Sequence, residues 1–471
     1  MRIDYKTQLF KYICADTLSC LLAWATYCLL LQSKFQLTWP VDIQVMRMNE
    51  LLWYGLPIVW LYWMAVYSIS GYYNREELLF KSPLTEFLVT ITSSLVGTLV
   101  IFFFLLTVKP DPLFDRLYEE SYFVLLGAFF GFTYLFRLVI THRVSQLILE
   151  RKVGFSTLVL GVGNKAEKFK EEIDRMRKPI GYDIRGFVNL PKREACKVEE
   201  RLVLGSFEEI DRLITEQETD IVVIAVDGIT ESEVYHYMHV LCRLNVKIKL
   251  LPTNYQLLTG AARMDTLRGI PMVDLTAVRM SGMQKNVKRL FDVAFSLVML
   301  IVLIPVYLFF LLIIREKPIY CQERIGLHGK PFTIYKFRTM LLDAEAEGPC
   351  LAQEDDSRVT SLGGVMRKYR LDELPQFYNV LRGDMSLVGP RPERSYFINQ
   401  IVQTAPYYYM LSNVRPGLTS LGMVKYGTAT TLGQLIERAD YDVLYVENMS
   451  LSIDIKIALY TVKTIVTGEG L

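Results

Sequence analysis

Four apolar stretches in the first third of this 471-residue chain constrain its fold more than any other feature. They run near residues 13–31, 51–69, 84–108 and 122–140. Each approaches the roughly 20 residues that a helix needs to cross a bilayer. Backbone groups inside a bilayer must be hydrogen-bonded within the protein, which favours helices. We therefore predict a membrane α-helical bundle over residues 1–150.

Lys and Arg are distributed unevenly between the segments that join these stretches. Nine lie in the N-terminus, in the second loop, and at the end of the fourth stretch or after it: Arg2, Lys6, Lys11, Arg75, Lys81, Arg137, Arg143, Arg151 and Lys152. Four lie in the other two loops: Lys34, Arg47, Lys109 and Arg116. The positive-inside rule then places both ends of the bundle in the cytoplasm. Asp16 interrupts the first stretch near its cytoplasmic end, where we expect the carboxylate to reach the membrane interface.

The overall charge excludes one class of partner. The formal net charge is only +2, because 52 Lys and Arg nearly balance 50 Asp and Glu. A nucleic-acid binder would carry a strong basic field, so no nucleic acid is expected as a partner. Any anion site must therefore be local.

The seven cysteines form no Cys-x-x-Cys pair and no cluster of metal-ligand spacing, and we interpret them as reduced and structural.

Residues 151–280 have a different pattern, in which short β-branched runs alternate with charged amphipathic stretches. The run 157–160 leads into Gly161-Val162-Gly163-Asn164-Lys165-Ala166, which resembles a dinucleotide-binding fingerprint. The next expected strand ends in Asn189, where a ribose-binding carboxylate would be expected. Residues 221–224 and 246–251 read as further strands of the same sheet. We predict an α/β Rossmann-like domain that is structural or dimerising, and whether it binds a nucleotide stays open.

A fifth hydrophobic segment lies between Asp292 and Arg315, where about 22 residues carry no charge and suffice to span by length. Both flanks are basic, and four preceding spans already return the chain to the cytoplasm. Pro305, near the middle, removes a backbone hydrogen bond and kinks a helix. We predict a re-entrant membrane helix in a monotopic α/β catalytic domain over residues 281–471, with a plain span as the alternative.

An acidic pair, Asp372 and Glu373, follows a basic stretch in this last region. Pro375 suits the first turn of a helix, and apolar residues recur at helical spacing until Gly383, so the pair is expected at a helix N-terminus. An acidic pair there is commonly a cap. Nearby cations favour a chemical role instead: Lys336, Arg338, Arg367, Lys368, Arg370 and Arg391, the last of these in a stiff Gly/Pro turn.

Two carboxylates among several cations can serve phosphoryl transfer. One carboxylate can be a nucleophile that forms an acyl phosphate, while the other helps to hold Mg²⁺ through oxygen ligands. The arginines and the metal would neutralise a diphosphate as the leaving phosphate departs. The four histidines, at positions 142, 236, 239 and 328, are far apart except for the pair at 236 and 239, and they suggest no triad or metal set.

Five motifs in the last third resemble those of one family, the polyprenyl-phosphate hexose-1-phosphate transferases, also called bacterial sugar transferases. The motifs are Lys288-Arg289-Leu290-Phe291-Asp292, Gln322-Glu323-Arg324-Ile325-Gly326, Tyr335-Lys336-Phe337-Arg338-Thr339-Met340, Leu371-Asp372-Glu373-Leu374-Pro375-Gln376 and the run from Gly383 to Pro392. The resemblance covers about 285–471. With four spans and a Rossmann-like domain ahead of it, the whole chain resembles the long form of the family, which often dimerises.

The resemblance implies a reaction and a place for it. The family transfers a sugar 1-phosphate from a UDP-sugar to undecaprenyl phosphate, a membrane lipid, and releases UMP. This implies an enzyme in the bacterial inner membrane, with its catalytic domain on the cytoplasmic face, that starts exopolysaccharide, capsule or O-antigen synthesis. Asp372 would be the nucleophile and Glu373 would hold Mg²⁺. Lys336, Arg338, Arg367 and Arg391 would bind the substrate phosphates, and Pro305 would kink the re-entrant helix.

Two departures from the family pattern, and two alternatives, stay open. Ile304-Pro305 stands where many members have Ser-Pro, and residues 420–427 differ from the common Gly-Trp continuation. Glucose, galactose and an N-acetylated amino sugar therefore all remain candidate donors. A membrane-bound nucleotide-sugar epimerase or dehydratase is one alternative, although the chain contains no Tyr-x-x-x-Lys pair of the kind such enzymes use. An inactive scaffolding homologue is the other.

Overall fold

The computed structural model describes residues 5–35, 41–74, 83–108, 115–177, 179–190, 195–244, 246–253, 270–275, 280–314, 316–342, 344, 348–351, 353, 356–427 and 429–467. Of the cations used above for orientation, Arg2, Arg75, Lys81, Lys109 and Arg315 lie outside these residues. The chain forms two compact units. The first comprises Met1–Phe155, Met176–Asp183 and Gly282–Asn286, and the second comprises Ser156–Arg175, Ile184–Ser281 and Val287–Leu471.

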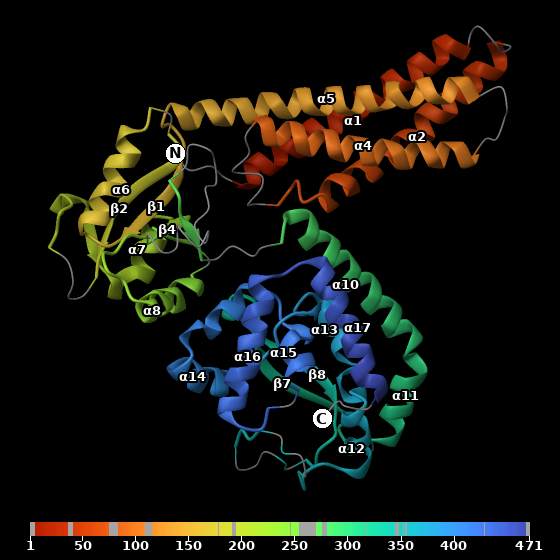
Figure 1. The fold of residues 1–471 in the computed structure, drawn as a ribbon. Helices are drawn as coiled ribbons and strands as arrows, with labels where there is room; N and C mark the ends of the chain where they lie inside the picture. The colour runs from red at the N-terminus through yellow and green to blue at the C-terminus, as the bar shows by residue number, and fades with distance from the viewer. Residues whose placement is uncertain are drawn as a thin grey trace. The chain divides into compact units, whose positions relative to one another are not determined.

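The described residues of the first unit form the helices α1 (Tyr5–Phe35), α2 (Val41–Ile69), α4 (Pro83–Val108) and α5 (Asp115–Leu149) (Figure 1). Among these residues, the helical segments Tyr5–Leu30, Pro83–Phe104 and Tyr122–Leu149 are each long and apolar enough to cross a membrane. The remaining predicted stretch, 51–69, lies within α2. Aromatic rings form the centre of the bundle, where Trp63 stacks on Phe129 with ring centroids 4.6 Å apart.

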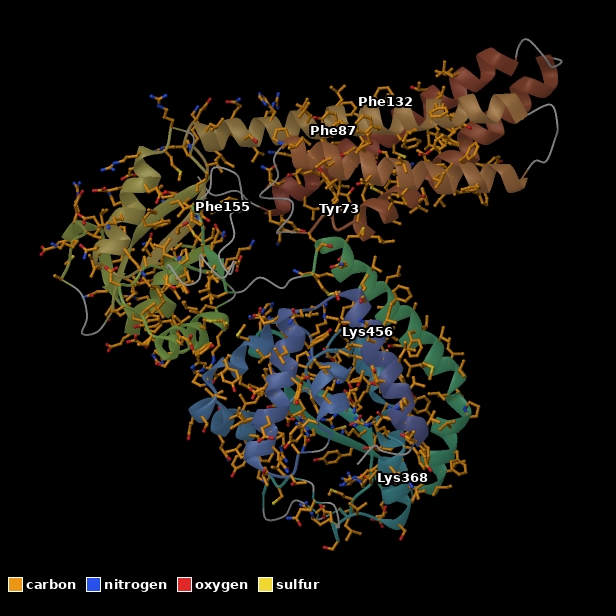
Figure 2. The ribbon with its side chains drawn as sticks, in the orientation of Figure 1. Tyr73, Phe87, Phe132, Phe155, Lys368 and Lys456 are labelled. Carbon is orange, nitrogen blue, oxygen red and sulfur yellow. The ribbon has the colours of Figure 1, made fainter. Side chains whose placement is uncertain are left out.

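The expectation that Asp16 reaches the membrane interface is wrong, because its side chain is fully buried between helices. Arg137 of α5 donates from Nε to Asp16 Oδ1 at 2.6 Å and from Nη2 to Oδ2 at 2.8 Å. The hydroxyl of Tyr73 (Figure 2) donates to the same Oδ2 at 2.7 Å. A buried charge needs a partner, and here the partner lies 121 residues away in the chain.

The region after α5 forms a six-stranded sheet in the order β3-β2-β1-β4-β5-β6. Its strands are β1 (Phe155–Leu160), β2 (Tyr182–Asn189), β3 (Val203–Ser206), β4 (Ile221–Ile224), β5 (Lys247–Leu250) and β6 (Val273–Asp274). β4 pairs in parallel with both β1 and β5, β2 pairs in parallel with β3, and β6 is antiparallel. Every residue of β1 and β4 is buried, as in a parallel sheet covered on both faces. The predicted strands at 221–224 and 246–251 are confirmed.

In the described part of this region, the sheet is accompanied by the helices α6 (Asn164–Arg175), α7 (Ile210–Glu216) and α8 (Glu231–Cys242). The turn between β1 and α6 holds the glycines of the expected fingerprint. Gly161 has a φ of 114°, and a Cβ there would collide with the Ala225 carbonyl oxygen. Packing of the chain against β4 therefore requires this glycine whether or not a nucleotide binds.

Two helices, α10 (Gly282–Val302) and α11 (Ile304–Ile313), follow and are bent relative to each other by 58° (Figure 1). Pro305 lies in the first turn of α11, close to the bend. The proline has no N–H to continue the hydrogen bonds of α10. Taken together, the two helices are also long and apolar enough to cross a membrane. If this bent pair counts as one span, the described residues hold up to four candidate spans.

The rest of the chain packs helices around two small sheets. One is the antiparallel hairpin of β7 (Ile319–Ile325) and β8 (Pro331–Phe337), and the other is the parallel pair β9 (Ser386–Val388) and β10 (Gly417–Thr419). The helices are α12 (Ser361–Lys368), α13 (Gln376–Arg382), α14 (Ser395–Thr404), α15 (Leu421–Lys425), α16 (Leu432–Glu447) and α17 (Leu451–Thr467).

The basic motif at the start of α10 secures this arrangement. Arg289 donates to the carbonyl oxygens of Val380 at 2.7 Å and Leu381 at 3.0 Å, which lie at the C-terminal end of α13. Lys288 donates to the Val388 carbonyl at 2.8 Å, at the end of β9. Cations are favoured at helix C-termini, where carbonyl groups lack partners. The motif therefore holds α13 and β9 against α10.

Candidate active site

The acidic pair lies in a short 3-10 turn, Leu371–Glu373, and α13 begins three residues later at Gln376. The pair therefore precedes the helix rather than forming its first turn. Arg370 enters the turn with a left-handed φ of 52°, a strained conformation for a non-glycine residue. Both carboxylates are largely buried, with Asp372 8% and Glu373 7% exposed. Burial at this level requires compensation by opposite charge or by hydrogen bonds.

Glu373 has that compensation. Lys336 Nζ donates to its Oε1 at 2.8 Å, and Arg391 Nη2 donates to the same oxygen at 3.0 Å. Arg370 Nη1 lies 3.7 Å from Oε2. Burial opposes the charged form, but the three cations hold the pKa of Glu373 well below its usual range. Glu373 is therefore ionised at neutral pH.

Asp372 is different. Within the described part of the chain, no hydrogen bond reaches its carboxylate. Burial raises the pKa of Asp372 to about 6, with the charge of Glu373 adding to the rise and the cation of Lys336 opposing it. A buried carboxylate without hydrogen bonds, ionised only above about pH 6, has the properties of a reactive group rather than of a helix cap.

All six residues predicted for catalysis and phosphate binding line a single pocket of about 290 Å³. They are Lys336, Arg338, Arg367, Asp372, Glu373 and Arg391. Arg367 Nε donates to Thr339 Oγ1 at 3.0 Å, whereas Arg338 Nε donates to the Lys317 carbonyl at 2.9 Å. Pro305, in α11, is not among the lining residues.

Lys368, in the same basic stretch as Arg367, does not line the pocket. It is the last residue of α12 (Figure 2), its side chain is exposed, and its Nζ lies 5.7 Å from the centroid of the Tyr369 ring. Helical geometry separates the two neighbours, since Arg367 points toward the pocket while Lys368 does not line it.

Sequence reasoning missed a second set of charged residues in the pocket. Glu393 is buried, and its Oε2 accepts from Arg324 Nη1 at 2.9 Å while its Oε1 pairs with Arg438 Nη2. Arg438 comes from α16, far downstream of the motifs. The only signal in the sequence was the isolated cation within an otherwise amphipathic helix.

The loop that departs from the family pattern also reaches the pocket. Met423 and Gly427 line it, and the Met423 sulfur lies 3.0 Å from Arg391 Nη1. Met423 is buried. Residues 420–427 therefore contribute directly to the wall of the site.

The two carboxylates suit a magnesium ion as far as the chain supplies ligands. Mg²⁺ is commonly bound by one or two carboxylates together with phosphate oxygens of a substrate. Glu373 Oε1 accepts hydrogen bonds from two cations, whereas the nearest cation to Oε2 among the described residues is Arg370, at 3.7 Å. Among the residues that the structure describes, no group of three His, Cys, Asp or Glu side chains forms a complete metal site. The donor set therefore fits a metal that a bound substrate helps to hold.

Comparison with known proteins identifies the family. The model of the bacterial sugar transferase family matches residues 283–468. The chain is 37% identical over 211 residues to UDP-glucose:undecaprenyl-phosphate glucose-1-phosphate transferase of Caulobacter vibrioides, covering 42% of this chain and 79% of that one. The chain belongs to the bacterial sugar transferase family.

Two longer relatives match over a smaller share. UDP-N-acetylgalactosamine-undecaprenyl-phosphate N-acetylgalactosaminephosphotransferase of Aeromonas hydrophila is 37% identical over 45% of this chain and 51% of its own. UDP-glucose:undecaprenyl-phosphate glucose-1-phosphate transferase of Escherichia coli is 32% identical over 51% of this chain and 53% of its own. The chain thus spans about half the length of these relatives. A solved structure of UDP-D-quinovosamine 4-dehydrogenase from Vibrio fischeri, 17% identical over 23% of this chain and 85% of that one, has a TM-score of 0.20, too low to show a shared fold.

Proposed function

We propose that this protein transfers a sugar 1-phosphate from a UDP-sugar to undecaprenyl phosphate through a covalent intermediate on Asp372. The observation that carries the proposal is the contrast within the acidic pair. Glu373 is held by three cations, whereas Asp372 lies in the same cationic pocket without a hydrogen bond from the described residues. A buried, unpartnered carboxylate beside fixed positive charge suits nucleophilic attack on a diphosphate.

The reaction has two displacements at one phosphorus atom. In the first, an oxygen of the Asp372 carboxylate attacks the sugar-bearing phosphorus of the UDP-sugar, and the bond to the bridging oxygen breaks. The electron pair leaves with UMP, and Asp372 carries the sugar 1-phosphate as an acyl phosphate. In the second, an oxygen of undecaprenyl phosphate attacks the same phosphorus, the acyl bond breaks, and the Asp372 carboxylate is restored. The product is undecaprenyl diphosphosugar.

The cations of the pocket stabilise the charge that moves during both steps. The oxygens of the diphosphate would be bound by Arg391, Arg367, Lys336 and Arg338. Fixed charges of this kind need no reorganisation during the reaction. Glu373, through Oε2, and the substrate phosphates would hold Mg²⁺. The ion supplies further neutralisation of the leaving phosphate. Glu373 also keeps Lys336 and Arg391 close to the nucleophile.

The membrane parts suit a reaction between one water-soluble and one lipid substrate. We propose that α10 and α11 form a re-entrant helix kinked near Pro305, which places the pocket at the cytoplasmic face of the bacterial inner membrane. The 58° bend and the basic residues on both flanks support this topology. The name of the E. coli relative includes undecaprenyl phosphate, and a pocket at the membrane face would give such a lipid access to Asp372.

We also propose a division into domains at 1–150, 151–280 and 281–471. Separate clusters of buried apolar side chains in the helical bundle, the six-stranded sheet and the C-terminal region support it. The strand order of the sheet supports a Rossmann-like domain. A homodimer is expected from the resemblance to the long form of the family, and cross-linking of the intact protein would test it.

The donor sugar is the least constrained part of the proposal. The names of the relatives specify N-acetylgalactosamine in one case and glucose in others. The pocket wall at 420–427 differs from the common family pattern, so neither sugar carries over by resemblance alone. We retain UDP-glucose, UDP-galactose and the UDP-N-acetylhexosamines as candidate donors for exopolysaccharide, capsule or O-antigen synthesis.

The test is release of UMP by the purified, detergent-solubilised protein with Mg²⁺ and undecaprenyl phosphate, across a panel of UDP-sugars. We expect one donor to give release that depends on the lipid over many turnovers. Without the lipid, a single turnover should leave the radiolabelled sugar phosphate on the protein, and the Asp372→Asn variant should show no label. Silence with every donor would favour a scaffolding role, and a change in the sugar without UMP release would favour an epimerase or dehydratase.

A further inference from the structure

Arg391 is held in the pocket through both its side chain and its backbone. Its backbone N–H donates to Asp442 Oδ2 at 3.0 Å. Asp442 is 2% exposed and belongs to α16, 51 residues downstream. A hydrogen bond from a backbone N–H to a buried carboxylate is strong and directional, so it fixes the chain at the residue whose side chain reaches Glu373.

The second oxygen of Asp442 fixes the backbone next to Met423, a pocket residue that contacts Arg391. Oδ1 accepts from the backbone N–H of Gly422 at 2.8 Å. A Cβ at Gly422 would lie 2.6 Å from the Arg438 carbonyl oxygen, so only glycine allows this approach to α16. The next residue, Met423, has its sulfur 3.0 Å from Arg391 Nη1. One carboxylate thus holds the backbone of both Arg391 and its neighbour.

The same face of α16 makes a second contact to the turn that carries Arg391. Arg438 precedes Asp442 by one helical turn, and its Nη2 pairs with the buried carboxylate of Glu393. Glu393 is two residues after Arg391 and also accepts from Arg324 Nη1 at 2.9 Å. The turn is therefore held on both sides of Pro392, by Asp442 at Arg391 and by Arg438 at Glu393.

We propose that Asp442 and Arg438 are positioning residues that aim the Arg391 guanidinium at Glu373 and at the diphosphate of the donor. The inference rests on the proposed function for the identity of that diphosphate. Neither residue needs to touch the reacting phosphorus. Loss of either should change how well Arg391 binds the diphosphate, because a displacement of about 1 Å at a binding group can cost up to roughly 100-fold in rate.

The test is a double-mutant cycle read by UDP binding in calorimetry and by donor kinetics. Asp442→Asn keeps the shape of the side chain but replaces one acceptor oxygen by an NH₂ group. This group is a donor and cannot accept the hydrogen bond from the backbone N–H. We expect it to weaken UDP binding about tenfold in the wild-type background and by less than about twofold in the Arg391→Met background. Equal losses in both backgrounds would overturn the inference, because Asp442 would then act independently of Arg391.

A control variant and a second test variant separate positioning from folding. Asp440→Asn lies on the same helix, where the exposed Asp440 accepts from the Tyr407 hydroxyl at 2.6 Å, and it should leave UDP binding unchanged. If Asp442→Asn does not fold, Arg438→Gln provides the same cycle through Glu393 and should again show its loss only when Arg391 is present. A loss with Arg438→Gln that persists in the Arg391→Met background would count against positioning.

The binding readout also separates this inference from the proposed function. If the wild type binds UDP and the cycle is non-additive but no donor releases UMP, the transferase proposal fails and the positioning role stands. If UMP is released and the cycle is additive, the transferase proposal stands and the positioning role fails. A wild type that binds no UDP would overturn both, because Arg391 would then have no diphosphate to bind.

Discussion

The helical bundle and the candidate active-site pocket both bury two acidic residues beside arginine, but the contacts of these residues differ. In the bundle, Asp16 receives two hydrogen bonds from Arg137 and one from Tyr73. Glu86 accepts from the Tyr72 hydroxyl at 2.6 Å. Every one of these charged side chains is fully buried, so the ion pairs are isolated from solvent and from ligands.

In the pocket, only one member of the pair is saturated. Glu373 is held by cations, and Asp372 shares their field without a hydrogen bond from the described residues. The difference shows how to separate structural from reactive buried charge. Mutual satisfaction of all polar groups favours a structural role, whereas one unpartnered group facing a pocket favours chemistry.

The largest effect is expected for Asp372→Asn. The amide keeps the shape of the side chain and removes the nucleophile, so turnover should fall by at least about 10⁴-fold. UMP release measures the loss, and an unchanged melting temperature would show that the fold is retained. A variant that kept most of its rate would exclude the covalent step, and direct attack by the lipid phosphate would replace it.

The matching change in the bundle is Arg137→Met. It leaves Asp16 buried without its cation, which should destabilise the bundle by about 3–5 kcal/mol. Thermal unfolding in detergent measures this effect. The double variant Arg137→Met/Asp16→Leu removes both charges and should regain most of the stability. If the single variant were as stable as the wild type, the ion pair would not be needed to hold the bundle.

Glu373→Gln should act on the metal response. The amide retains one oxygen but loses the charge, and we expect the Mg²⁺ concentration for half-maximal rate to rise about 10–100-fold. A magnesium titration of UMP release at saturating donor measures the shift. A lower rate with an unshifted magnesium curve would indicate that Glu373 serves only to hold Lys336 and Arg391.

The smallest expected effect is a shift in pH dependence with Lys336→Met. Asp372 must be ionised to attack, and burial raises its pKa to about 6, so kcat/KM for the donor should fall as pH drops below about 6. Lys336 lowers the pKa of Asp372, so its removal should move this acidic limb upward by about one pH unit. The readout is the pH at which kcat/KM falls to half of its plateau. The plateau value itself is not used, because weaker phosphate binding also lowers it. A limb that stays in place or moves downward would contradict the assignment to Asp372.

Much of the site could be predicted because its residues lie in short, local motifs. Asp372 and Glu373 are adjacent, and the cations around them occur in segments with strong turn or strand signals. The structure places all six predicted residues in one pocket. The residues that were missed, Arg438 and Asp442, lie in a helix whose pattern is amphipathic and unremarkable when considered alone. Their contacts to Glu393 and Arg391 depend on how α16 packs.

The sequence by itself determined the apolar helices, four of the six strands of the sheet (β1, β2, β4 and β5), the bend near Pro305 and the identity of the charged motifs. Each of these follows from hydrophobic periodicity, from the missing N–H of proline or from residues close in the chain. Only the tertiary structure decided which carboxylate is paired and which is not. Asp16 was expected to reach the membrane interface but is buried against Arg137, and Glu373 rather than Asp372 receives hydrogen bonds from Lys336 and Arg391. Electrostatic partners are chosen by distance in space, which packing sets and sequence separation does not reveal.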